Sequence, residues 1–218
     1  MDTSTALARI ERCGIVVVLR GRFPPNTALP VVETLLQAGL DAIEFTTNSA
    51  QALEALQAVR AAFGADVCAG MGTVLEADAA QRALNAGADF LVAPSFSPAV
   101  VAAAQAADRL IAPGVITPTE CVDAWALGVR LLKLFPIGPL GLDYFRTLRG
   151  PLDQMAFMCN GGIDDANAGE FIRAGALACG TGWPVGDGSS PLEWVRDRAH
   201  RLRRVVDAAR GVPGSLMV

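Results

Sequence analysis

The sequence predicts a single (β/α)8 barrel, the TIM-barrel architecture, from three observations. One phrase recurs along the chain: an Ala/Leu-rich helical end, a glycine and then an apolar run. Apolar runs and amphipathic stretches alternate without an obvious linker, which favours parallel strands joined by right-handed crossovers. The 218 residues, 52% of them hydrophobic, suffice for one well-buried core. We therefore expect residues 1–218 to form one domain.

The recurring phrase marks the places where helices end and strands begin. It occurs as QAGLDAIEF (37–45), NAGADFLVA (85–93), ALGVRLLKL (126–134) and RAGALACGT (173–181), with FGADVCAG (63–70) as a fifth copy. Its glycine is suited to a left-handed cap at a helix end. Between two copies, SAQALEALQAVRAAF (49–63) carries apolar residues at helical spacing.

Eight strands are expected in order along the chain, the number that a closed barrel of this kind needs. They are IVVVL (15–19), DAIEF (41–45), DVCAG (66–70), DFLVA (89–93), RLIAP (109–113), VRLLKLF (129–135), MAFMC (155–159) and ALACG (176–180). A doubly wound open sheet is the rival, but LRGRFPPN (19–26) lacks the glycines of a dinucleotide-binding turn. Residues 193–211 predict a closing helix with solvated arginines, and we expect the tail at 212–218 to be disordered.

Composition excludes several classes of function. The net charge is −4 with no basic block outside the closing helix, so nucleic acid and anionic membranes are poor candidate partners. The N-terminus lacks the apolar core of a signal peptide, and no apolar run spans a bilayer, so we expect a cytoplasmic protein. The five cysteines are scattered and the single histidine is His200, so a histidine-centred zinc site lacks its parts. A metal site built from carboxylates alone remains open.

Polar residues stand where chemistry belongs in such a barrel, at the C-terminal strand ends. Read in order, these ends carry Arg20, Glu44, Thr73, Ser95, Thr117, Lys133, Asn160 and Thr181. Because loops are polar, Ser95, Thr117 and Asn160 are equally well explained as ordinary loop residues. Glu44 and Lys133 are not, since apolar residues flank both within their strands.

Lys133 is the only lysine of the chain, beside 17 arginines. Burial lowers the pKa of an amine, which favours the neutral nucleophile, and arginine cannot replace it because it does not deprotonate. Glu44 then serves as general acid and base, its pKa raised by apolar neighbours such as Ile43 and Phe45. The alternative is a structural ion pair between the two side chains. Arg20 either clamps a substrate carboxylate or forms a salt bridge at the barrel rim.

Two glycine-rich loops, NGGIDD (160–165) and GTGWP (180–184), follow the last two strands. In barrels that act on phosphorylated substrates, these two loops bind the phosphate through backbone N–H groups. A lysine amine, a neighbouring carboxyl and a phosphate site together indicate a class I aldolase. Its lysine forms an iminium with a substrate ketone while a C–C bond breaks or forms, and the reaction requires no metal or other cofactor.

The same residues closely resemble one enzyme family over about residues 14–184. The segments are VVLRG (17–21), DAIEFTTNS (41–49), GMGTVL (70–75), APS (93–95), LLKLFP (131–136) and NGGI (160–163). They are similar to the 2-keto-3-deoxy-6-phosphogluconate (KDPG) and 2-keto-3-deoxy-6-phosphogalactonate (KDPGal) aldolases. The resemblance implies a TIM-barrel aldolase that is commonly a homotrimer.

The resemblance also implies roles for individual residues. Lys133 is the Schiff-base lysine and Glu44 the proton shuttle. The substrate-binding residues, which hold the pyruvyl carboxylate or wall the pocket, are Arg20, Gly72, Thr73, Pro94 and Phe135. The phosphate-binding residues are Gly161, Gly162, Gly180, Thr181 and Gly182.

Two departures from the family pattern bear on the substrate. KDPG aldolases usually carry an arginine shortly after the strand-two glutamate, where this chain has Asn48, while Arg20 ends strand one. This arrangement resembles the phosphogalactonate branch, which cleaves 2-dehydro-3-deoxy-6-phosphogalactonate to pyruvate and D-glyceraldehyde 3-phosphate. The segment GTGWP replaces the family's usual G-G-S-W.

The alternatives within the family are the C4 epimer, 2-dehydro-3-deoxy-6-phosphogluconate, and 4-hydroxy-2-oxoglutarate (KHG) as a main or side substrate. Outside it stand another phosphate-binding barrel, such as an epimerase, and a sugar-acid phosphate sensor. The buried lysine argues against the first, and the intact Lys133/Glu44 pair argues against the second.

Overall fold

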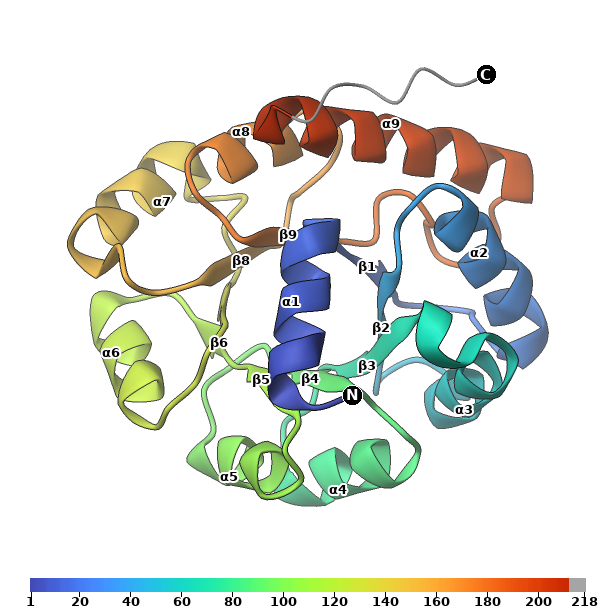
Figure 1. The fold of residues 1–218 in the computed structure, drawn as a ribbon, viewed down its shortest axis with the longest axis horizontal. Helices are drawn as coiled ribbons and strands as arrows, with labels where there is room; N and C mark the ends of the chain where they lie inside the picture. Colours follow the sequence, from blue (N-terminus) through green and yellow to red (C-terminus); the bar gives the residue numbers. More distant parts are fainter. Residues whose placement is uncertain (212–218) are drawn as a thin grey trace.

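The computed structural model describes residues 1–211, so the tail at 212–218, for which the sequence predicts disorder, lies outside the described residues. Parallel strands form a ring that is surrounded by helices (Figure 1). The predicted TIM barrel is confirmed. None of the helices within residues 1–211 is long and apolar enough to cross a membrane.

The ring contains nine strand segments, which follow one another in the order β5-β4-β3-β2-β1-β9-β8-β7-β6. Every pairing between neighbours is parallel. The segments are β1 (Ile15–Leu19), β2 (Ala42–Thr46), β3 (Cys68–Gly72), β4 (Phe90–Val92), β5 (Leu110–Ala112), β6 (Gly114–Val115), β7 (Leu132–Leu134), β8 (Phe157–Asn160) and β9 (Ala178–Thr181).

The segment beyond the fifth predicted strand (109–113) accounts for the difference between eight and nine. The predicted strand contains β5, which pairs with β4, and ends at Pro113, whereas β6, which pairs with β7, follows it and was not predicted. Proline has no N–H and cannot donate to the ladder, so the regular pairing is interrupted there. The carbonyl of Pro113 still accepts from the Lys133 N–H at 2.9 Å. The chain itself thus closes the barrel between its two end segments.

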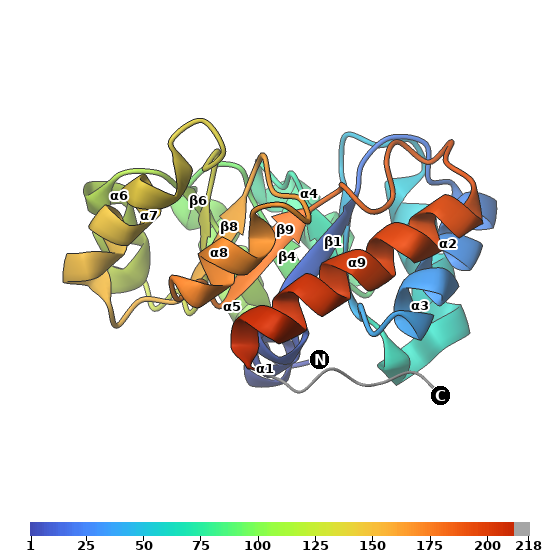
Figure 2. The same ribbon diagram turned by 90° about the horizontal axis from the view of Figure 1, so that it is seen from above.

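Helices follow the strands and form the outer ring, seen from the side in Figure 2. They are α2 (Pro25–Gln37), α3 (Ala52–Phe63), α4 (Ala77–Asn85), α5 (Pro98–Ala106), α6 (Pro118–Ala126), α7 (Gly141–Arg149), α8 (Ala168–Arg173) and α9 (Leu192–Arg210), with short 3-10 turns at Gly64–Asp66 and Gly150–Leu152. The glycines of the recurring phrase all have positive φ, as the sequence predicts: Gly39, Gly64, Gly87, Gly128 and Gly175.

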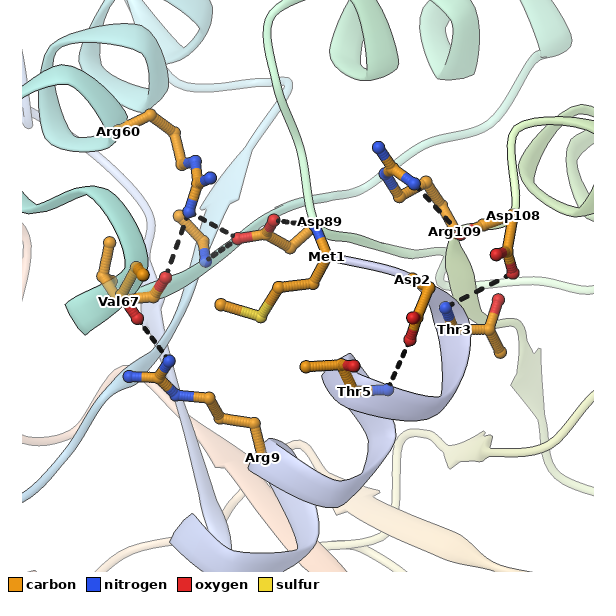
Figure 3. A network of polar contacts seen from close by, with 12 residues as sticks. Met1, Asp2, Thr3, Thr5, Arg9, Arg60, Val67, Asp89, Asp108 and Arg109 are labelled. Atoms are coloured by element: carbon orange, nitrogen blue, oxygen red, sulfur yellow. Dashed lines mark hydrogen bonds and ion pairs between the residues drawn. The ribbon is translucent and has the colours of Figure 1, made fainter.

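The first helix, α1 (Thr3–Cys13), lies across the middle of the ring in Figure 1. The start of the chain binds aspartates that stand just before strands: the Met1 ammonium binds Asp89 (2.7 Å), the Thr3 N–H donates to Asp108 (3.4 Å) and Arg9 donates to Asp41 (2.9 Å). Figure 3 shows the first two of these contacts. Since strands begin at this end, α1 covers the N-terminal mouth of the barrel.

Candidate active site

Lys133 is the middle residue of β7 and is only 3% exposed. Because side chains alternate along a strand, Leu132 and Leu134 point to one face and Lys133 to the other. Burial lowers the pKa of the Lys133 amine, while Glu44 opposes this shift and Arg20 adds to it. The structure therefore provides the desolvated amine that the sequence predicts.

Glu44 lies in β2, paired with Val18 of β1 and Gly70 of β3, and is 1% exposed. Neither of its carboxylate oxygens has a hydrogen-bond partner among the described residues. Burial raises the pKa of Glu44, opposed by Lys133 and Arg20. An unpaired carboxyl with a raised pKa is suited to moving protons, whereas a structural ion pair would satisfy its oxygens.

A cavity of about 320 Å³ opens beside these two side chains. Its walls come from the C-terminal ends of the strands and the loops after them, which is where the sequence predicts the site. The lining residues are Val18, Arg20, Glu44, Lys133, Phe135, Asn160, Gly161, Gly162, Ile163, Gly180, Thr181, Gly182, Trp183 and Gly186. Seven of the predicted binding residues thus share one pocket wall with both candidate catalytic groups, since Arg20, Phe135 and the predicted residues of the two glycine loops all belong to it.

Phe135 and Gly72 shape the space around the two ionisable groups. The Lys133 Nζ lies 4.8 Å from the centroid of the Phe135 ring. A Cβ at Gly72 would lie 1.8 Å from the Glu44 Oε1, so only glycine leaves room for this carboxyl. Gly72 thus does not line the cavity but leaves the space that the Glu44 carboxyl occupies.

Thr73 and Pro94 also stand behind the wall. The Arg20 Nη2 donates to the Thr73 hydroxyl at 3.4 Å, and Thr73 itself has a left-handed backbone with φ of 59°. A Cβ at Gly114 would lie 2.2 Å from the carbonyl carbon of Pro94, so the two backbones pack tightly. Gly114 pairs with Lys133, which places Pro94 one strand away from the amine.

The glycines of the two loops offer backbone donors. Gly161 and Gly162 have φ of 87° and 79°. Their N–H groups and that of Gly182 donate to no other backbone group in residues 1–211, although all three residues line the cavity. Unpaired N–H groups that face a cavity are suited to binding an anion.

Gly180 and Thr181 have further contacts within the fold. A Cβ at Gly180 would lie 1.9 Å from the Asn160 Nδ2, so this glycine makes room for the amide side chain. The Thr181 hydroxyl donates to the Ile163 carbonyl at 2.5 Å and accepts from the Trp183 N–H at 3.0 Å. That hydroxyl ties the two loops together, and its predicted contact with phosphate stays a prediction.

A family model described as KDPG and KHG aldolase matches residues 8–195. The chain belongs to this aldolase family. It is 35% identical over 182 residues to the 2-dehydro-3-deoxy-phosphogluconate aldolase of Treponema pallidum, covering 83% of this chain and 84% of that protein. It is 31% identical over 201 residues to the probable 2-dehydro-3-deoxy-6-phosphogalactonate aldolase of Rhizobium meliloti, covering 90% and 93%.

A solved structure of similar shape is described as a native KDPGal structure. It superposes with a TM-score of 0.86 at 28% identity and covers 90% of this chain and 96% of that one. The fold and the enzyme class of this aldolase, a carbon–carbon lyase, are therefore shown. Its relatives include one named as a phosphogluconate aldolase and one named as a probable phosphogalactonate aldolase.

Three polar or aromatic residues at the aldolase site were not assigned a role from the sequence. Asn160 is 3% exposed, and its Oδ1 faces the cavity region with no hydrogen-bond partner among the described residues. Trp183 and Ser49 are the other two: Trp183 lines the cavity, and the Ser49 hydroxyl accepts from the Gly21 N–H at 2.9 Å, beside Arg20. The position of Asn160 at the C-terminal end of a strand was a weak sequence signal for a role in the site, whereas no sequence pattern indicated the contacts of Ser49.

The other ionisable groups of the aldolase offer no second centre in the described chain. Within residues 1–211, no group of three or more His, Cys, Asp or Glu side chains could hold a metal ion. All five cysteines are buried thiols. Burial raises the pKa of Cys68 and Cys179 to about 12 and that of Cys121 to about 11, so these thiols stay protonated. Thr117, expected at a strand end, caps α6 instead, accepting from the Glu120 N–H.

Proposed function

We propose that this aldolase cleaves 2-dehydro-3-deoxy-6-phosphogalactonate to pyruvate and D-glyceraldehyde 3-phosphate through a Schiff base on Lys133. The proposal rests on one observation: a desolvated amine, Lys133, lines the same cavity as Glu44, a buried carboxyl that has no hydrogen-bond partner among the described residues. The glycine loops form the other wall of that cavity. The substrate has a ketone for the amine and a phosphate for the loops.

The first stage forms the iminium. The neutral Lys133 amine attacks the C2 ketone, and the addition gives a carbinolamine. Glu44, protonated because burial raises its pKa, gives a proton to the C2 hydroxyl, which leaves as water. The iminium carries the positive charge, and the Glu44 carboxylate that results lies close enough to influence it.

The second stage breaks the C3–C4 bond. The Glu44 carboxylate takes the proton of the C4 hydroxyl, the C4 oxygen becomes the aldehyde, and the bonding electrons move into the iminium as an enamine. D-Glyceraldehyde 3-phosphate departs. Glu44 returns the proton to C3 of the enamine, and water hydrolyses the resulting iminium to pyruvate and free Lys133.

The two ends of the substrate bind to different parts of the pocket. Arg20, supported by Thr73, pairs with the carboxylate at C1, because guanidinium matches a carboxylate in bidentate fashion. The unpaired N–H groups of Gly161, Gly162 and Gly182 hold the phosphate at C6. Phe135 supplies an apolar wall near the amine, and Pro94 packs behind it against Gly114.

One sequence feature favours the galacto over the gluco substrate. Asn48 stands where the phosphogluconate enzymes usually carry an arginine, and Arg20 at the end of β1 supplies the cation instead. Relatives named for either substrate align with most of this chain, so the relatives do not decide between the two. The unpaired Asn160 Oδ1 offers an acceptor for a substrate hydroxyl near the reacting carbons.

Pyruvate release from the two C4-epimeric phosphosugar acids, measured side by side, tests the substrate. We expect kcat/KM for the galacto epimer to exceed that for the gluco epimer by at least about tenfold, the effect of one hydrogen bond near C4. Equal values, or a preference for the gluco epimer, would keep the aldolase and overturn the proposed substrate. For the Asn160→Ala variant, assayed in parallel, we expect a smaller ratio of kcat/KM between the galacto and gluco epimers.

A second candidate substrate is 4-hydroxy-2-oxoglutarate, because the matching family model includes KHG aldolases. Its distal carboxylate would take the place of the phosphate at the same N–H groups. We expect cleavage of this substrate with a higher KM than that of the phosphorylated one, since a carboxylate offers fewer acceptor oxygens. A lower KM would make it the main substrate.

We also propose that the protein is a homotrimer, as the family resemblance implies. Large apolar side chains are exposed on the single chain, and assembly would cover those that lie at its interfaces: Leu75, Val122, Leu127, Leu140 and Leu192 are exposed. Sedimentation equilibrium tests this directly, because a monomer of 22.7 kDa would be distinguished from a species three times as heavy.

A further inference from the structure

Arg198 of α9 is held between two tryptophans. Its guanidinium carbon lies 4.1 Å from the ring centroid of Trp183 and 3.8 Å from that of Trp194. Trp194 and Arg198 are four residues apart on α9 and therefore share a helix face. The expectation that the arginines of this helix face solvent is wrong for Arg198, Arg203 and Arg210, which are half-buried. It is confirmed for Arg196, Arg201 and Arg204, which are exposed.

Arg198 is connected to both glycine loops by hydrogen bonds. Its Nη1 donates to the Trp183 carbonyl at 2.9 Å. The Trp183 N–H donates to the Thr181 hydroxyl at 3.0 Å, which in turn donates to the Ile163 carbonyl at 2.5 Å. Three hydrogen bonds thus connect the guanidinium to the loop after β8.

Trp194 packs against the loop after β9, which contains Trp183. A Cβ at Gly186 would lie 3.6 Å from the Trp194 ring, so ring and loop backbone are in contact. The N–H groups of Val185 and Gly186 both donate to the Gly182 carbonyl, at 3.1 and 3.0 Å, and fold the loop into a compact turn. Gly182, Trp183 and Gly186 all line the cavity, whereas Arg198 does not.

We propose that Arg198 is a positioning residue, which fixes the segment 182–186 so that the Gly182 N–H, which donates to no other backbone group within residues 1–211, can bind the phosphate end of the substrate. The inference rests on the proposed function, because it assigns the phosphate to this end of the cavity. Only arginine has two flat faces for the two rings and an edge donor for the Trp183 carbonyl. Lysine at this position would keep the charge and lose the stacked geometry.

The distinction from a merely structural role lies in what the substitution changes. If Arg198 only packed α9 against the barrel, its loss would lower thermal stability and affect all substrates alike. If it positions the phosphate loop, its loss weakens binding at the phosphate end and spares chemistry at Lys133, which lies in β7, two strands away from β9 and the loop that follows it.

The experiment compares Arg198→Lys with the matched control Arg196→Lys, an exposed position on the same helix. KM and kcat are measured for the phosphorylated sugar acid, and pyruvate C3–H exchange into D2O is measured by NMR as a reaction that needs no phosphate. For Arg198→Lys we expect KM for the phosphorylated substrate to rise about tenfold or more. Exchange and the control should stay within twofold of the native enzyme.

An unchanged KM for the phosphorylated substrate in Arg198→Lys, or an equal loss in pyruvate exchange, would overturn the proposal. Trp194→Phe gives a second reading if Arg198→Lys folds poorly, because it thins the stack and leaves the arginine; it should raise KM in the same direction by a smaller factor. Titration with inorganic phosphate, followed by tryptophan fluorescence, needs no turnover. If the native protein binds phosphate but cleaves no sugar acid, the proposed function is refuted and the positioning role is not. In that case the positioning role still requires Arg198→Lys to bind phosphate about tenfold more weakly than the native protein.

Discussion

Lys133 and Glu44 are two buried ionisable groups whose surroundings move their pKa values toward each other. Burial disfavours the ammonium of one and the carboxylate of the other, and their mutual attraction opposes both shifts. Their residue types violate the rule that charges stay out of apolar strands, which is why the sequence could predict both. Asn160 was less visible, because a polar residue at a strand end is ordinary.

Replacing Lys133 by arginine tests the amine at the residue scale. Arg keeps a cation in the cavity, yet it does not deprotonate and cannot form an iminium. We expect kcat to fall by more than about 10⁴-fold, the loss typical of a removed nucleophile. Pyruvate release gives the rate and circular dichroism reports whether the fold is retained. Substantial residual cleavage by a folded variant would contradict the assignment.

Replacing Glu44 by glutamine tests its raised pKa through stability. Because the folded-state pKa of Glu44 lies above the ordinary value of 4.5, this residue favours folding below pH 4.5, and its contribution is lost as pH rises through the folded pKa. Glutamine does not ionise, so the variant does not lose this contribution to the free energy of unfolding as the pH rises. We therefore expect a higher Tm for the variant at about pH 8, where 1 kcal/mol corresponds to about 2–4 °C.

The Tm difference should vanish below pH 4.5, where Glu44 is protonated in both states. A variant that is less stable than the native protein at the higher pH would show that the carboxylate is stabilised by a partner. The same variant should lose cleavage by about 10²–10⁴-fold, the usual contribution of a general acid and base.

At the scale of elements, the recurring helix–glycine–strand phrase was sufficient to predict the parallel barrel and the left-handed glycines. The segment β6 after Pro113 was not predicted, because its two residues, Gly114 and Val115, are too short a run to indicate a strand. The stack of Arg198 between two tryptophans was not predictable either. Trp183 and Arg198 are fifteen residues apart, and only the placement of α9 against the loop brings them together.

Gly72 at the end of β3 is an element-scale requirement for the site. In Gly72→Ala the new methyl group would overlap the Glu44 Oε1, since the two positions are 1.8 Å apart. We expect Glu44 to be displaced and kcat/KM to fall by about 10²-fold, as for a misplacement of about 1 Å. The matched control is Gly150→Ala, where the methyl group meets nothing within 4 Å. Equal activity of the two variants would contradict this account.

At the scale of the whole molecule, the two mouths of the barrel have different tasks. The C-terminal mouth carries the cavity with Lys133 and Glu44. The N-terminal mouth is covered by α1, and there Asp89, only 1% exposed, accepts from the Met1 ammonium (2.7 Å), Arg60 (2.9 Å) and the Ala69 N–H (3.0 Å). Figure 3 shows this cluster. Stability and chemistry should therefore respond to different substitutions.

Asp89→Asn tests this separation. The variant leaves the ammonium and the guanidinium without their counter-charge, and we expect the free energy of unfolding to fall by about 3 kcal/mol. The kcat of the folded variant should match that of the native enzyme. Asp143→Asn is the control: its side chain is 96% exposed and pairs with Arg146 at 3.4 Å, so a change below about 0.5 kcal/mol is expected. Denaturant unfolding measures both.

The central claim, a Schiff base on Lys133, is tested most directly by trapping. The protein is mixed with pyruvate, reduced with borohydride, digested and analysed by mass spectrometry for the modified peptide. Only two kinds of amine are available, the single lysine and the N-terminus. The account predicts a reduced pyruvate adduct on Lys133 in the native protein and none in Lys133→Arg. No adduct in the native protein, or an adduct on Met1 alone, would contradict it.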